Sequence, residues 1–250
     1  MTSESYKVLA GATLLLLFLE TVCVAQNKKD SPAEFGPQQT SKHLDVNHVI
    51  SVVAASENGF RTALGDYGYK YDVIIQTFKD GKVTGEYRRT TQVALDKKGT
   101  LEERVLYFPR PSVTDIQVTR EDLEDLSGRN QFVLETVNIS KYNFTYAGNE
   151  RIDNIDLYVI DVEPKAISSR ERLFSGRIWL RANDLRILRM RGRTVQKGSQ
   201  RFPVMDSYRA QVGEQYLFPA LAVAEEQLEF PRGSVHLRIE VKYSDYVKLK

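Results

Sequence analysis

Cysteine is almost absent from the sequence, which has only Cys23 among its 250 residues. Cys23 lies in an N-terminal segment that we interpret as a cleaved leader, so the mature chain would have no thiol. This excludes a disulfide framework, thiol catalysis and a zinc site built on thiolates. Because Glu20-Thr21-Val22 is a poor match to a lipidation box, we also expect that no acyl chain is attached to Cys23.

Histidine is scarce too, with three residues in the chain. His43 and His48 are five positions apart, which does not place two ligands on one helical face. His236 falls on the polar side of an expected strand. The sequence also has no nucleophile elbow, phosphate-binding loop, dinucleotide fingerprint or metalloprotease motif. We therefore predict a protein that is not an enzyme, with no cofactor and no metal site.

Long apolar runs are missing after the N-terminus. Val8 to Leu19 is apolar and follows Lys7, but it is too short to span a bilayer. We predict a signal peptide over residues 1–25 and a polar linker over 26–42, leaving no transmembrane segment after cleavage. The leader holds one Lys and two Glu, so its removal changes the net charge from +2 to +3. That charge does not indicate a nucleic-acid partner.

The rest of the chain, residues 43–250, alternates apolar and polar side chains with the period of β-strands. Tyr67 to Thr77 and Val235 to Tyr243 are the clearest examples. Hairpin turns are expected at four places, namely Asp80-Gly81, Lys98-Gly99, Ala147-Gly148-Asn149 and Ala182-Asn183-Asp184. This pattern predicts one domain built on a large, curved, meandering antiparallel sheet.

Two helices are expected beside the sheet. The first covers Leu44 to Glu57, has its apolar residues on one face and ends at Gly59. The second begins after the N-cap Thr119 and ends before Gly128. Its acidic residues fit the positive end of the helix dipole better than a catalytic carboxylate pair.

Two groups of side chains are candidates for binding. Aromatic residues in the strands would fill a core or line a cavity on the concave face of a curved sheet; they are Tyr67, Tyr69, Tyr71, Tyr142, Phe144, Tyr146 and Trp179. Five arginines alternate along two strands and would form a basic patch; they are Arg177, Arg181, Arg189, Arg191 and Arg193. This patch would bind phosphate or lipid headgroups, or pair with acidic neighbours on a solvated face, which we favour.

Several motifs in this order resemble the LolA-like superfamily of outer-membrane lipoprotein-sorting proteins, and in particular its uncharacterised exported bacterial members. The motifs cover about half of the mature chain; they are Tyr142 to Asp153, Val159 to Lys165, Phe174 to Leu180, Asp184 to Ile187 and Tyr243 to Tyr246. These are turn and sheet residues, so they indicate the fold better than the activity.

The resemblance implies an α+β, mostly β fold: a strongly curved open antiparallel sheet, or half-barrel, with helices covering the concave face. It also implies binding of a lipid or acyl chain, or of an envelope protein partner. No position here matches the carrier's cavity arginine, so lipoprotein transport is not implied.

Our main hypothesis is a non-catalytic binding or carrier module for a lipid or other hydrophobic ligand, located in the bacterial periplasm or secreted. The first alternative is an interaction or sensory module whose sheet edge or arginine surface contacts an envelope protein. The second alternative is a hydrolase whose residues converge only in the fold.

Overall fold

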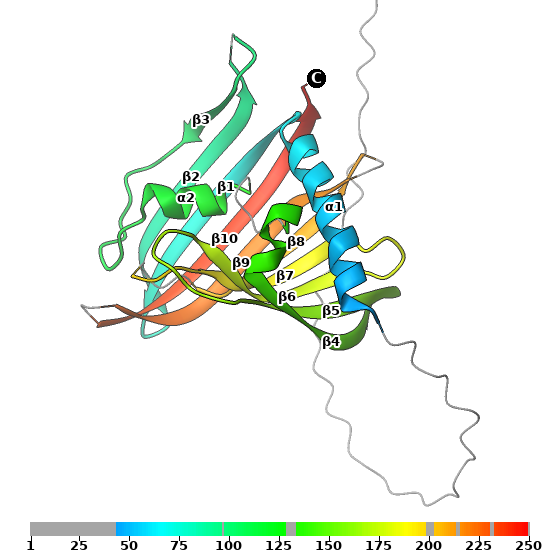
Figure 1. Cartoon of the computed structure of the whole chain (residues 1–250). Coiled ribbons are helices and arrows are strands. Elements are labelled where there is room, and N and C mark those ends of the chain that lie inside the picture. Colours follow the sequence, from blue (N-terminus) through cyan, green and yellow to red (C-terminus); the bar gives the residue numbers. More distant parts are fainter. Residues whose placement is uncertain are drawn as a thin grey trace, which may run out of the picture. The chain divides into compact units, whose positions relative to one another are not determined.

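The computed structural model describes residues 44–249 except 97, 129–133, 199–202, 214–215 and 231–232. The predicted leader, the predicted linker and His43 lie outside the described residues. The described strands form one antiparallel sheet of ten strands (Figure 1). They are β1 (Tyr67–Lys79), β2 (Lys82–Leu95), β3 (Leu101–Tyr107), β4 (Tyr142–Ile152), β5 (Ile155–Pro164), β6 (Leu173–Arg181), β7 (Ile187–Val195), β8 (Met205–Val212), β9 (Tyr216–Phe230) and β10 (Gly233–Lys248).

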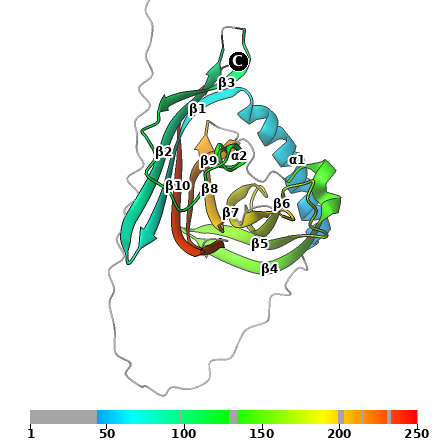
Figure 2. The same ribbon diagram turned by 90° about the vertical axis from the view of Figure 1, so that its left-hand side faces the viewer.

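The strand order is β3-β2-β1-β10-β9-β8-β7-β6-β5-β4, so β3 and β4 are the two edges. The chain leaves the sheet after β3 and re-enters it at the opposite edge with β4. Figure 2 shows the sheet curving around the helix α2, with the helix α1 on the open side. The structure thus confirms the predicted fold class, a mostly β, strongly curved open antiparallel sheet with helices covering its concave face.

Helix α1 (Val46–Leu64) begins at Asp45, whose carboxylate accepts a hydrogen bond from the backbone N–H of His48 at 3.1 Å. The predicted end at Gly59 is wrong. The helix continues past Gly59 because Phe60 and Leu64 are buried against the sheet. No atom lies within 4 Å of the Cβ position of Gly59, so its surroundings do not require a glycine. Tertiary packing therefore outweighs the low helix propensity of glycine.

Helix α2 (Arg120–Leu126) confirms its prediction at both ends. Thr119 and Asp122 form a reciprocal capping box, and Gly128 follows the helix with φ +81°. A short 3₁₀ helix, η1 (Thr136–Lys141), precedes β4. None of the helices among the described residues is long and apolar enough to cross a membrane.

Three of the four expected hairpin turns are confirmed, at Asp80-Gly81, at Gly99 and after Arg181. The turn expected at Ala147-Gly148-Asn149 is wrong, because β4 continues through this segment with a bulge at Gly148. The chain turns instead at Asp153 and Asn154, whose φ values are +48° and +67°. Asp and Asn tolerate this left-handed backbone better than other side chains, which explains the shift.

The concave face carries two hydrophobic clusters. One cluster joins β1, β2, β9 and β10 to the C-terminal half of α1 and to Leu126 of α2. The other joins β4 to β7 to the N-terminal half of α1 and to Leu134. Helix α1 thus spans both clusters, and β8 lies between them in the sheet.

The edge strand β3 is the most exposed apolar part of the sheet. Val105, Leu106 and Tyr107 are 45–52% exposed, and Phe108 follows at 51%. Since β3 has a partner strand on one side only, this edge can accept a further extended segment.

Candidate functional site

A cavity of about 470 Å³ lies on the concave face between the two hydrophobic clusters. Its volume is in the range typical of small-molecule sites. Its apolar and small lining residues come from both clusters and from β7 and β8; they are Leu126, Tyr142, Leu173, Phe174, Met190, Gly192, Met205, Ser207, Ala222 and Tyr243. We call this space the central cavity.

Small side chains on the floor leave this space open. In one row across the sheet, Met190 of β7 is paired with Ser207 of β8, which is paired with Ala222 of β9. In the next row, Gly192 is paired with Met205. Leucine or isoleucine at Ser207 or Ala222 would project into the gap between the clusters, so the cavity results from small residues on adjacent strands.

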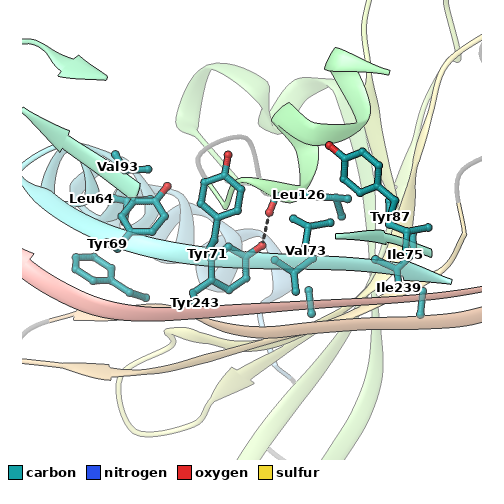
Figure 3. Close-up of a cluster of buried hydrophobic side chains, with 14 of the residues drawn as sticks. Leu64, Tyr69, Tyr71, Val73, Ile75, Tyr87, Val93, Leu126, Ile239 and Tyr243 are labelled. Atoms are coloured by element: carbon teal, nitrogen blue, oxygen red, sulfur yellow. Dashed lines mark hydrogen bonds between the residues drawn. The ribbon is translucent and has the colours of Figure 1, made fainter. Parts of the chain in front are cut away.

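Two tyrosine hydroxyls hold α2 over the floor. Tyr243 of β10 donates to the backbone carbonyl of Leu126 at 2.8 Å, as Figure 3 shows, and Tyr69 of β1 donates to that of Ser127 at 2.9 Å. Carbonyls at a helix C-terminus lack partners within the helix, so these bonds satisfy them. After α2 the chain passes close to Tyr243 at Gly128. A Cβ atom at this position would lie 2.7 Å from the Tyr243 ring, so the absence of a side chain permits the approach.

Three ion pairs surround the mouth of the central cavity, and each joins different elements. Arg61 of α1 pairs with Glu135 beside η1. Lys141 of η1 pairs with Glu171 before β6 at 3.0 Å. Arg172, also before β6, pairs with Asp125 of α2 at 2.5 Å. All of these residues line the cavity, which therefore has an apolar floor and a charged, mutually neutralised rim.

Asp125 has an unusual environment within this rim. Burial raises the pKa of Asp125 to about 6, because loss of hydration outweighs attraction to Arg172. Repulsion from Asp122 and Glu124 acts in the same direction as burial, and a hydrogen bond from Thr194 opposes it. Ionisation of Asp125 is thus less favourable than that of an aspartate in water.

This environment predicts a pH-dependent stability. The pKa of Asp125 is higher in the folded state than in the unfolded state, so its stabilising contribution is present below the unfolded value of 3.8 and is lost as the pH rises through about 6. Asn at this position does not titrate. We expect the free energy of unfolding of the wild type, relative to Asp125→Asn, to fall by on the order of 2 kcal/mol between about pH 4 and pH 7.5. Urea unfolding monitored by Trp179 fluorescence measures it, and a difference that stays constant or grows with pH would contradict it.

A second cavity, of about 780 Å³, lies between α1, α2 and the β2–β3 end of the sheet. We call it the edge cavity. Its apolar walls are Phe60, Leu64, Val118 and Leu123. Arg61 lines both cavities, so the two adjoin there.

A buried ion pair, absent from the sequence predictions, joins α1 to the sheet. The guanidinium of Arg209 on β8 donates to both carboxylate oxygens of Glu57, at 2.7 and 2.9 Å. The two side chains are 2% and 4% exposed, and the guanidinium lies 4.2 Å from the ring centre of Phe60. A signal for Glu57 was available, because it falls on the apolar stripe that contains Val53, Phe60 and Leu64. A carboxylate in that position requires a buried cation.

The structure distributes the seven predicted aromatic residues over different places. Tyr142 lines the central cavity, and Phe144 packs against the cluster behind it. Tyr69 and Tyr71 are buried in the other cluster; burial raises the pKa of Tyr71 to about 12, and its hydroxyl donates to Glu103.

The remaining three aromatics lie away from the central cavity. Tyr67 packs edge-on against Phe218, and Tyr146 is exposed on the edge strand β4. Trp179 packs with Leu157 and Val159 on the convex face, so the sheet separates it from the cavities. Its strand neighbours are apolar as well, so alternation alone did not identify which face is concave.

The five predicted arginines lie together on β6 and β7, but acidic side chains neutralise most of them. Arg177, Arg181 and Arg189 make bidentate pairs with carboxylates, and Arg193 lies 3.6 Å from Glu226; the three bidentate partners are Asp161, Asp184 and Asp206. Arg189 also stacks over Trp179 at 4.4 Å. This surface fits the solvated, charge-paired face that we favoured.

The described histidines lie far apart in the fold. His48 is exposed on α1, and His236 contacts Glu225 and the ring of Phe78. Among the residues that the structure describes, no three His, Cys, Asp or Glu side chains are grouped closely enough to hold a metal ion.

No protein-family model and no curated protein matches the chain. The structure is similar to solved structures that include a DUF1329 family protein from Desulfovibrio piger, with 16% identity, 81% of this chain and 92% of that chain covered, and a TM-score of 0.41. A LolA superfamily protein from Nitrosomonas europaea has 15% identity, coverage of 80% and 93%, and a TM-score of 0.37.

A structure described as an outer membrane lipoprotein-sorting protein domain, from Vibrio parahaemolyticus, has 14% identity, coverage of 79% and 91%, and a TM-score of 0.41. The superfamily that the sequence motifs resemble is therefore among the matched structures. These similarities concern the fold, and at TM-scores below 0.5 they do not indicate function.

Proposed function

We propose that this protein is a non-catalytic, exported binding module that holds a hydrophobic ligand in the central cavity. The observation that carries the proposal is the gap between two hydrophobic clusters, which small floor residues keep open under α2. A well-packed interior would close such a gap, because protein cores reach the density of organic crystals.

The chemistry of the cavity supports an acyl chain or another elongated apolar group. Its lining offers Leu126, Phe174, Met190 and Met205 for apolar contact. Burial of each methylene group contributes about 0.8 kcal/mol, so a medium-length chain would bind without a specific polar contact. The three rim ion pairs would remain hydrated beside the polar end of the ligand. A ligand with apolar groups at both ends would have to remove water from these charges, so the rim disfavours it.

Ala222→Leu tests the proposal by filling the floor. Ala222 is 2% exposed and lines the central cavity, so the added side chain would occupy ligand space. We expect the affinity for the neutral apolar probe N-phenyl-1-naphthylamine, measured by its fluorescence, to fall at least about tenfold. This corresponds to about 1.4 kcal/mol, or the burial of about two methylene groups.

Ala147→Leu is the matched control, because Ala147 is exposed at the bulge of the edge strand β4. It should bind the probe as the wild type does. Both variants should keep the wild-type circular dichroism spectrum, since filling a cavity adds little strain when the space is open. Equal probe affinity of Ala222→Leu and wild type, or non-saturable binding by both, would refute the proposal.

The alternatives have weaker support. Contact of an envelope protein with the arginine surface competes with carboxylates that already pair with Arg177, Arg181 and Arg189. Contact through the sheet edge at β3 stays a prediction. For a hydrolase, the described residues offer no metal-binding group and no histidine in either cavity.

A further inference from the structure

Arg89 is an exception on the concave face of β2. Its neighbours on that face are Tyr87, Thr91 and Val93, which are 6%, 0% and 0% exposed. Arg89 is directly paired with the buried Val73 of β1 and lines the edge cavity. A guanidinium in an otherwise buried, mostly apolar row is costly unless it has a partner.

The described residues supply Arg89 with little compensation. Its Nε donates to the hydroxyl of Thr91 at 3.2 Å, and no carboxylate among the described residues lies within ion-pair distance. Glu103 lines the same cavity and accepts a hydrogen bond from Tyr71, but it forms no ion pair with Arg89.

The other cations of the edge cavity are already paired with carboxylates. Arg61 pairs with Glu135, and Arg120 pairs with Glu124 at 2.8 Å. Arg120 is 90% exposed, so water hydrates it in any case. Among the described cations that line this cavity, Arg89 therefore has its terminal nitrogens available for an anion.

We infer that the ligand is an anionic amphiphile, and that Arg89 binds its carboxylate or phosphate group in the edge cavity. This inference rests on the proposed function, since the hydrocarbon chain would lie in the central cavity, which adjoins the edge cavity at Arg61. A planar guanidinium binds either group through two parallel hydrogen bonds. Fatty acids and lipid phosphates share this chemistry.

Three ligands with the same hydrocarbon chain test the inference: dodecanoate, dodecyl phosphate and dodecanol. The affinity of each is measured by displacement of N-phenyl-1-naphthylamine, at ligand concentrations below those at which the ligand aggregates. We expect the wild type to bind at least one of the anions about tenfold or more tightly than the alcohol, as a charge-assisted hydrogen bond would give. The better anion identifies carboxylate or phosphate as the preferred group.

Arg89→Gln should reduce the affinity for the anion to that for dodecanol and leave the affinity for dodecanol unchanged. Arg120→Gln, from the same cavity, should keep the anion preference. Ala222→Leu should weaken all three ligands equally, because it acts on the chain. Circular dichroism verifies folding, and Arg89→Lys, which keeps the charge, should retain part of the preference.

Three results would overturn the inference. If the wild type binds dodecanol and the anions equally, the proposed function stands but the anion site does not. The same conclusion follows if the preference survives Arg89→Gln. If none of the three ligands displaces the probe, the proposed function fails as well.

Discussion

Arg209→Met should destabilise the protein by about 3–5 kcal/mol, the typical cost of leaving a buried carboxylate without its partner. The Glu57 side chain is 4% exposed, and each of its two carboxylate oxygens accepts a hydrogen bond from Arg209. Removal of the guanidinium would leave that charge inside the concave face, between α1 and β8. Urea unfolding, followed by the fluorescence of the single tryptophan Trp179, measures the loss.

The double variant Glu57→Met/Arg209→Met tests whether the lost stability comes from the unpaired charge of Glu57 or from the lost packing of Arg209. Well-packed apolar residues of similar volume often replace a buried ion pair at no net cost, so the double variant should recover most of the lost stability. Arg120→Gln is the control for an exposed pair and should change stability by less than about 1 kcal/mol. A double variant as unstable as Arg209→Met would show that Arg209 acts through packing instead of charge.

Gly192→Ala should cost about 3 kcal/mol, although it adds only one methyl group. Gly192 of β7 lies directly opposite Gly176 of β6, and the ring of Phe174 covers both. A Cβ on Gly192 would lie 2.4 Å from the backbone carbonyl oxygen of Ser175 and 2.5 Å from the Phe174 ring. The backbone cannot yield without disturbing the β6–β7 ladder. Thermal unfolding followed by circular dichroism measures the effect.

Gly59→Ala is the matched control, and its effect should have the opposite sign. Gly59 lies inside α1 and has no atom within 4 Å of its Cβ position. Alanine there should stabilise the helix by about 0.5–1 kcal/mol. Similar effects of the two substitutions would contradict the close approach of β6 and β7.

Much of the fold was predictable because its signals are local. The alternation in Tyr67 to Thr77 and in Val235 to Tyr243 marks half-buried strands, and Asp80-Gly81 permits the positive φ angles of a tight turn. Thr119 and Asp122 define the start of α2 in the same way. Each of these signals depends on neighbouring residues, so no knowledge of strand order is needed.

The errors have physical causes that act over long distances. Helix α1 passes Gly59 because the sheet buries Phe60 and Leu64, and a local propensity does not contain that contact. The turn expected at Gly148 is a bulge within β4. Glycine is common both in tight turns and in β-bulges, so its presence alone does not distinguish them. Trp179 lies on the convex face, since Ile178, Trp179 and Leu180 are all buried and no alternation marks their faces.

The candidate site was less predictable than the fold. The central cavity depends on Ser207 and Ala222, which lie on different strands and meet only through the strand register. Glu57 was detectable as a carboxylate on an apolar stripe, but Arg209, 152 positions away, was not. Arg89 differs from the other arginines only through what surrounds it in the fold.

The most direct test of the central claim is native mass spectrometry of the protein after incubation with a bacterial membrane lipid extract. The proposal predicts an adduct with the mass of one amphiphile on the wild type and on Ala147→Leu, and loss of that adduct in Ala222→Leu. Absence of an adduct on the wild type, or equal adducts on the wild type and Ala222→Leu, would contradict a ligand held in the central cavity.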